Sequence, residues 1–229
     1  YRKSGWRKTE SKRYRVVLKT NKYILIIALM TFVFNFVTNM GVNVYYFTYI
    51  VGNVGLMGVL AAAQIIVLPL ALIFPKLIAK FSTINLMIAG FLISAAGYLL
   101  NAIAGGNVGL LTIGGILTGA GTVPASMLIG LVLIECGDYN EWKGIHRMDG
   151  TMGSINGLAS KVGATIGTGA LGILLSAVGY SGDAANMPSA AITMIRLLYG
   201  IIPMILYLLT ALTLKGYKLN KMMPQIKAD

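Results

Sequence analysis

The chain has 229 residues, of which 56% are hydrophobic and only 11% charged, and its mean hydropathy is +0.76. This composition excludes a water-soluble domain and indicates an integral membrane protein. The formal net charge of +12 would suit nucleic acid only on a folded soluble module, whereas here the charges lie between apolar runs. The single cysteine, Cys136, excludes an internal disulfide.

The chain starts with a basic stretch, residues 1–22, which predicts a cytoplasmic linker beside the membrane. Because it begins at Tyr1 without a methionine, we expect it to be part of a longer protein. Six apolar runs follow, each long enough to cross about 30 Å of hydrocarbon. We predict membrane-spanning helices at about 23–50, 55–79, 84–104, 108–135, 151–179 and 189–214, and a cytoplasmic tail at 215–229.

The connections between these segments alternate in charge. Basic residues follow the second, fourth and sixth segments, whereas residues 51–54, 105–107 and 180–188 contain none. Because lysine and arginine collect on the cytoplasmic side, this pattern predicts that both termini are cytoplasmic and that the number of helices is even.

The first segment has three asparagines spaced four residues apart, Asn35, Asn39 and Asn43. In one continuous helix they would stack on a single face. Amides in hydrocarbon need partners, so this face should look into a bundle or a wet cavity. Hydrogen bonds between helices and contacts with a substrate are both consistent with the pattern.

The next three segments differ in their polar content. The second has Gln64 near mid-depth, and Pro69 and Pro75 predict bends toward its inner end. The third is mainly apolar and should face lipid. The fourth contains glycines and Pro124, which predict either a loosened helix lining a cavity or a kink used for packing.

The fifth segment carries one lysine, Lys161, about 15 Å from its inner end and so near the membrane midplane. Its stem cannot reach either interface, and an unpaired charge there costs about 3 kcal/mol on insertion scales. We therefore expect Lys161 to face a water-filled cavity or an acidic partner. In the sixth segment, Arg196 lies about 10 Å from the outer end and can reach the interface, which indicates a structural role.

The loop between the fourth and fifth segments, residues 137–150, concentrates opposite charges. It contains Asp138, Glu141, Arg147 and Asp149, and it directly precedes the helix that holds Lys161. Such a loop beside a buried cation favours a gated membrane pathway. Ion pairs among these residues would break and reform between conformational states.

This loop and the next helix resemble one family. The chain reads Asp138-Tyr139-Asn140-Glu141-Trp142-Lys143, then Gly153-Ser154-Ile155-Asn156-Gly157 and Ser160-Lys161-Val162-Gly163. These motifs resemble the C-terminal half of glycoside-pentoside-hexuronide:cation symporters, the melibiose-permease-like branch of the major facilitator superfamily.

The resemblance implies an all-α membrane protein with a six-helix bundle, the C-terminal half of a major facilitator fold built from two three-helix inverted repeats. Its partner would be a missing N-terminal six-helix half, which in the family supplies most sugar-binding groups and holds the coupling cation, Na⁺ or H⁺. No cofactor is expected in this chain. Lys161 matches the family's functional lysine, and Asn156 and Gly157 lie near positions that approach the sugar.

We therefore predict a secondary transporter of the cell membrane that carries a sugar or glycoside with a cation by alternating access. The expected substrate-binding residues are Lys161, Asn156, Gly157, Asn39, Asn35 and Gln64. The expected cytoplasmic gate consists of Asp138, Tyr139, Glu141, Arg147 and Asp149. The alternatives are a facilitator of another organic solute or lipid and a membrane scaffold that transports nothing. One histidine and one cysteine without nucleophile–base spacing argue against an enzyme.

Overall fold

The computed structural model of the chain describes residue 14, residues 16–182, residues 187–226 and residue 228. Most of the basic linker expected at 1–22 lies outside these residues. The described chain is helical and contains no strand, which confirms the all-α class. Its elements are α2 (Lys22–Thr38), α3 (Asn43–Tyr46), η1 (Phe47–Val51), α4 (Leu56–Ala63), η2 (Gln64–Val67), α5 (Leu68–Lys80), α6 (Thr83–Ala104), α7 (Val108–Trp142), α8 (Asp149–Ala177), α9 (Ser189–Arg196), η4 (Leu197–Ile201), α10 (Ile202–Leu214) and α11 (Leu219–Ile226).

Five helical stretches of the described chain are long and apolar enough to cross a membrane, and a bent pair makes a sixth candidate. The bent pair, Leu56–Val67 and Leu72–Ile78, turns by 49°. Pro69 lies at the bend, in the first turn of α5, where a proline costs no hydrogen bond. Pro75 lies inside α5, which continues through it.

The first candidate span, Lys22–Val51, covers the residues expected at 23–50, but it is not one continuous helix. The helix α2 ends at Thr38 and helical structure resumes at Asn43. Between them, Gly41 has a φ of +72°, a left-handed conformation that glycine adopts without the steric cost of a side chain. Asn35, Asn39 and Asn43 therefore do not form one continuous ladder.

The helix α7 is longer than the predicted segment 108–135. It continues to Trp142, so Asp138, Tyr139 and Glu141 stand on a helix and not in the loop expected there. The buried side chains of Tyr139 and Asn140 extend the packed face of α7 beyond the apolar run. Gly144, with a φ of +76°, follows the end of the helix.

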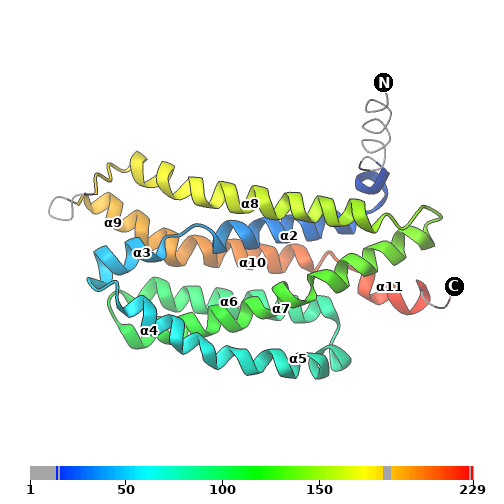
Figure 1. Cartoon of the computed structure of the whole chain (residues 1–229), viewed down its shortest axis with the longest axis horizontal. Helices are drawn as coiled ribbons and strands as arrows, with labels where there is room; N and C mark the ends of the chain where they lie inside the picture. Colours follow the sequence, from blue (N-terminus) through cyan, green and yellow to red (C-terminus); the bar gives the residue numbers. More distant parts are fainter. Residues whose placement is uncertain (1–13, 15, 183–186, 227, 229) are drawn as a thin grey trace.

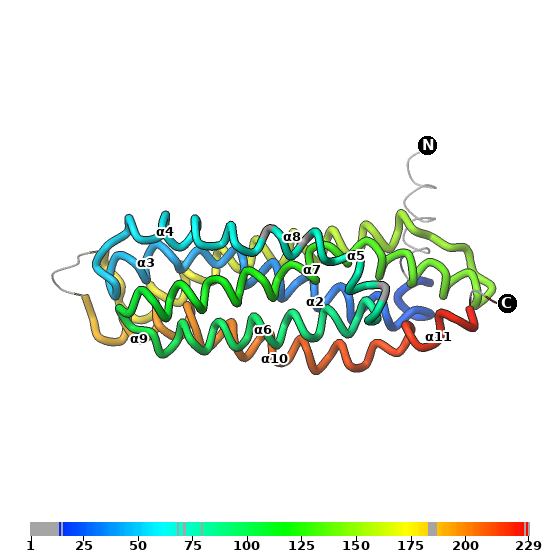
Figure 2. Tube along the Cα trace, turned by 90° about the horizontal axis from the view of Figure 1, so that it is seen from below, coloured from blue at the N-terminus to red at the C-terminus, as the bar shows by residue number. Residues whose placement is uncertain are grey.

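Close packing between helix pairs relies on glycine. An added Cβ at Gly163 or Gly167 of α8 would clash with the carbonyl oxygens of Phe32 and Phe36 on α2. Figures 1 and 2 show α2 and α8 side by side, and α6 packed along α7. An added Cβ at Gly121 of α7 would likewise clash with the carbonyl oxygen of Gly90 on α6. These glycines bring the helix backbones together, as in other membrane bundles.

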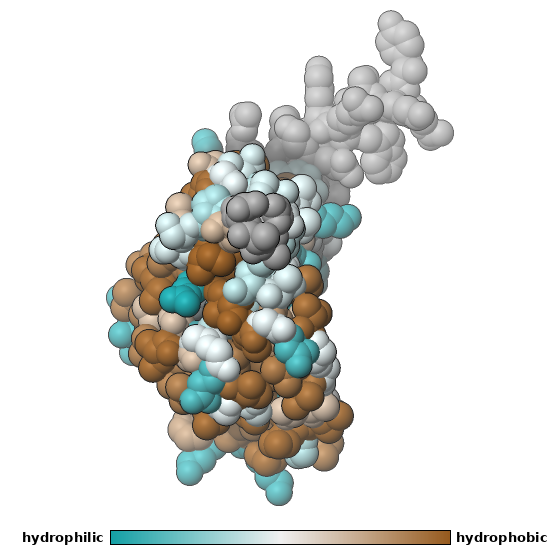
Figure 3. Space-filling view, turned by 90° about the vertical axis from the view of Figure 1, so that its left-hand side faces the viewer, coloured by the Kyte–Doolittle hydropathy of each residue, from teal (hydrophilic) through white to brown (hydrophobic). Residues whose placement is uncertain are grey.

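The bundle has two ends and an apolar flank. We call the end with the α7–α8 connection and α11 the loop end, and the end with α3 and α9 the opposite end (Figure 1). Seen from the opposite end, brown hydrophobic residues cover much of the sides (Figure 3). Large apolar side chains point outward from several helices, among them Leu72, Leu158, Ile173 and Leu212. The third predicted segment corresponds to α6. One side of α6 packs on α7 and α10, and another side exposes the apolar side chains of Leu92 and Ile103.

Candidate functional site

The lysine of the fifth span lies near the midpoint of the 29-residue α8. Lys161 is exposed on the bundle, and no hydrogen bond or ion pair joins it to another described residue. On α8, Gly163 and Gly167 are buried and pack against α2. Lys161 lies on the other side of the helix, where its ammonium group is exposed at the surface of the bundle.

The other predicted residues of α8 divide between two sides of the helix. Gly157 is four residues from Lys161 and shares its side, with open space where a Cβ would be. Asn156 is rotated from Lys161 by about 140° at 3.6 residues per turn. It accepts a hydrogen bond of 2.6 Å from the Thr31 hydroxyl of α2. The structure therefore groups Lys161 with Gly157 and places Asn156 in the contact between α2 and α8.

The predicted asparagines of the first span are bonded within their own helix. The Asn35 amide donates to the Thr31 carbonyl at 2.9 Å, and the Asn39 amide donates to the Asn35 carbonyl at 2.9 Å. The Asn39 carbonyl also accepts from the Thr168 hydroxyl of α8 at 3.2 Å. Near the helix break these amides satisfy backbone oxygens, and Asn39 remains exposed at the surface.

The last predicted substrate residue, Gln64, begins the short η2 helix. Its amide is exposed and faces a cavity that α7 closes from the other side. Lys161 does not line that cavity. The six predicted substrate residues therefore do not form a single cluster.

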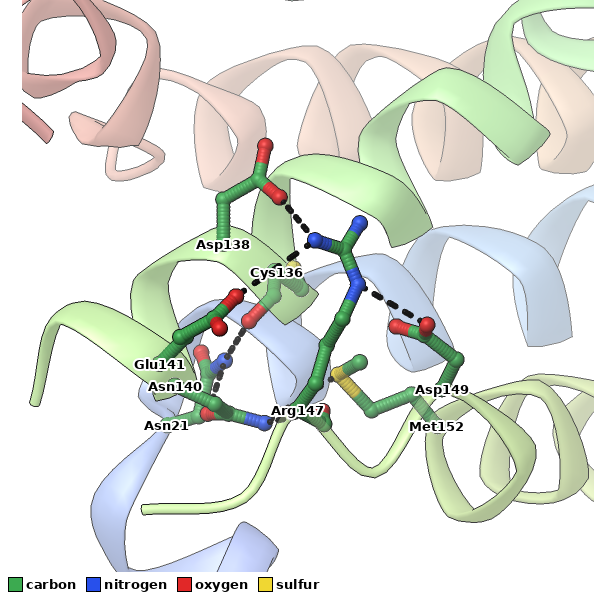
Figure 4. Close-up of polar contacts among 8 residues, drawn as sticks. All are labelled: Asn21, Cys136, Asp138, Asn140, Glu141, Arg147, Asp149 and Met152. Atoms are coloured by element: carbon green, nitrogen blue, oxygen red, sulfur yellow. Dashed lines mark hydrogen bonds and ion pairs between the residues drawn. The ribbon is translucent and has the colours of Figure 1, made fainter. Parts of the chain in front are cut away.

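The charged residues of the loop end do converge (Figure 4). The Arg147 guanidinium contacts Asp138 Oδ1 at 2.6 Å and Glu141 Oε2 at 3.7 Å through Nη1, and Asp149 Oδ2 at 2.9 Å through Nε. Asp138 and Glu141 come from the last turns of α7, and Asp149 begins α8. One cation thus holds the end of one span to the start of the next.

The local backbone allows this arrangement. An added Cβ at Gly137 would clash with Asp149 Oδ1 and would lie 3.2 Å from Arg147 Cγ, so glycine leaves the space for the cluster. Met148, just before α8, has a φ of 54°, which is uncommon for a residue other than glycine. The hydrogen bond from Arg147 to Asp149, with the nearby charge of Asp138, raises the pKa of the Arg147 guanidinium.

The fifth predicted gate residue, Tyr139, lies outside this cluster. Its ring makes an edge contact with Tyr23 of α2, with 5.2 Å between centroids, and packs beside Trp142. The ammonium of Lys143 lies 4.8 Å from the Trp142 ring. Tyr139 therefore belongs to the packed core of the loop end.

A buried pair of amides, which the sequence analysis missed, connects the same elements. Asn21 caps α2 by accepting from the amide of Tyr23, and its own amide donates to the Cys136 carbonyl and to Asn140 Oδ1, both at 3.0 Å. Asn140 in turn donates to the Arg147 carbonyl at 3.2 Å (Figure 4). Both asparagines are fully buried. The N-cap position of Asn21 was the one available signal, because asparagine favours that position.

Comparison with known proteins gives a consistent result. The model of a family described as MFS/sugar transport protein matches residues 8–221. The isoprimeverose transporter of Lactiplantibacillus pentosus is 31% identical over 218 residues, which is 93% of this chain and 45% of that protein. A putative sulfoquinovose importer of Salmonella typhimurium is 26% identical over 186 residues, covering 80% of this chain and 39% of that protein.

A third similar protein is the putative glycoside/cation symporter YagG of Escherichia coli, 32% identical over 83 residues, or 36% of this chain and 18% of that protein. The chain spans less than half the length of these relatives. The apolar spans and the family match together indicate a multi-pass membrane protein. The chain belongs to the MFS/sugar transport family, in agreement with its resemblance to the glycoside-pentoside-hexuronide:cation symporters.

Proposed function

We propose that this chain is the C-terminal six-helix half of a sugar transporter that works by alternating access and couples sugar entry to a cation, Na⁺ or H⁺. The relatives named for isoprimeverose and glycoside transport support the substrate class. The proportion of their length that the chain spans supports a second half of similar size. In this proposal the other half holds the coupling cation.

One observation carries the proposal: the exposed ammonium group of Lys161 on α8. Lys161 lies near the middle of an apolar span without a described partner, and a charge in such a place costs about 3 kcal/mol on insertion scales if lipid covers it. A second half-bundle facing this side would provide either an acid or a wet cavity. The neighbouring Gly157 adds no side chain and leaves room for a ligand beside the ammonium.

The Arg147 cluster supplies a second element of the proposal. It ties α7 to α8 at one end of the bundle through contacts that are partly exposed to solvent. Lys143, Arg147, Lys215 and Lys218 lie in or beside the connections at this end, which supports its placement in the cytoplasm of a cell-membrane protein. We propose that the cluster closes the cytoplasmic side in one state and rearranges in the other.

Uptake of labelled isoprimeverose by cells that express the full-length protein tests the proposal. Lys161→Ala should reduce uphill accumulation at least tenfold while the protein still reaches the membrane. Lys221→Ala is the matched control, because Lys221 is exposed on α11 at the loop end. Unchanged accumulation in Lys161→Ala would contradict the proposed role of Lys161. Competition by unlabelled sugars, compared with other organic solutes, distinguishes a sugar transporter from a facilitator of another cargo.

A further inference from the structure

A cavity of about 390 Å³ lies in the part of the bundle nearer the opposite end, away from the Arg147 cluster. Its walls come from α2, α3, α4, α6, α7 and α10, from the π-helical turns η1 and η4 and from the 3₁₀ turn η2. Its volume falls within the range of about 300–1,000 Å³ that is typical of small-molecule sites. No lysine, arginine, aspartate or glutamate is among the lining residues, so the cavity suits a neutral ligand.

Four departures from regular α-helix meet at this cavity. Gly41 and Val42 lie in the break after α2, and Phe47 belongs to the π-helical η1. Gln64 begins the 3₁₀ turn η2, and Tyr199 belongs to the π-helical η4. Such irregular turns occur often at functional sites, and within a membrane they persist where they line a cavity. Four of them around one space favour a site that binds a ligand.

Polar side chains also line this space. Asn101 is among the lining residues, but its Oδ1 atom is buried against Gly114 of α7 and does not open into the cavity. The amides of Gln64 and Asn43 line the same cavity and make no side-chain hydrogen bond within the described chain. Thr118 and Thr122 add hydroxyl groups on α7.

We infer that this cavity is a second sugar site, which binds one neutral ring separately from the Lys161 site. Planar amides and hydroxyl groups would bond the ring hydroxyls, while Phe47 and Tyr199 would pack against its apolar face. The choice of sugar as the ligand rests on the proposed function. The cavity and its unpaired amides do not depend on it.

The glycines of α7 provide a specific way to block the cavity. A Cβ at Gly115 would lie 3.9 Å from Gln64 Nε2 and 4.0 Å from Leu60 Cδ2, which is ordinary contact. Gly115→Ala should therefore fit without disturbing the helices. Gly115→Leu would extend its side chain into the cavity and occupy the space of a ligand. Gln64→Leu is a second test variant, which does not fill the cavity but removes an exposed amide from its wall and leaves the backbone of α7 unchanged.

The experiment measures equilibrium binding of radiolabelled isoprimeverose to the full-length protein in nanodiscs, with uptake measured in parallel. The wild type and Gly115→Ala should bind two molecules per chain. Gly115→Leu and Gln64→Leu should each lose one of them or weaken it at least tenfold, and Lys161→Ala should lose the other.

The two measurements test the second sugar site and the transport function separately. One site in the wild type, or two sites of unchanged affinity in both Gly115→Leu and Gln64→Leu, overturns the second site even if uptake is normal. Absence of uptake together with one bound molecule that Gly115→Leu abolishes would keep the cavity site and refute the transport proposal.

Discussion

At the scale of single residues, the three acids around Arg147 differ in how much they hold it. Asp138 is the closest and the least exposed, at 2.6 Å and 20%, whereas Glu141 lies 3.7 Å away and is 70% exposed. Exposed ion pairs contribute about 0–1 kcal/mol, and the contribution rises as water is excluded. The Asp138 contact should therefore dominate the cluster.

We predict that Asp138→Asn lowers the apparent melting temperature of the detergent-purified protein and reduces sugar accumulation several-fold. Glu141→Gln, the matched control on the same helix, should change both by much less. Equal effects from the two variants would show that the short Asp138 contact has no special role. An arginine keeps its proton across the physiological pH range at its ordinary pKa, and the neighbours of Arg147 raise its pKa further, so these pairs cannot open there through loss of that proton.

At the scale of elements, the contact between α2 and α8 depends on two glycines. An added methyl group at Gly167 would meet the Phe36 carbonyl oxygen and lie 3.0 Å from its carbon, both backbone atoms that cannot rotate away. Gly167→Ala should force the helices apart and destabilise the bundle by about 1–3 kcal/mol, the usual cost of overpacking.

The measurement is the apparent melting temperature of the purified full-length protein. Gly169→Ala is the matched control, because a Cβ there meets nothing within 4 Å and the residue lies on the same helix. We expect a clear decrease for Gly167→Ala and a shift near zero for Gly169→Ala. A tolerated alanine at Gly167 would show that α2 and α8 pack less closely than the structure indicates.

The elements also show what the sequence could predict. The apolar runs identified the helical class, because about 20 apolar residues have few other solutions in a membrane. The sequence did not predict the break after Thr38, because asparagines at four-residue spacing are typical of one face of a continuous helix. A single glycine, Gly41, gives no pattern that would predict a break. The concentration of charged residues at 137–150 predicted the cluster of Arg147 with its three acidic neighbours. The buried amides of Asn21 and Asn140 could not be predicted in this way, because they lie 119 positions apart and only the fold brings them together.

At the scale of the whole molecule, we expect Lys161 to lower the stability of this chain and to be required for transport. Within the 229-residue chain alone its side is uncovered, and a lysine covered by hydrocarbon costs about 3 kcal/mol on insertion scales. Lys161→Leu should therefore raise the apparent melting temperature of that chain. In the full-length protein the same change should abolish sugar accumulation, because the second half-bundle that we propose would face leucine in place of a cation. Lys221→Leu, at the loop end, should leave both quantities close to wild type. A full-length Lys161→Leu protein that still accumulates isoprimeverose would separate the deep charge from transport.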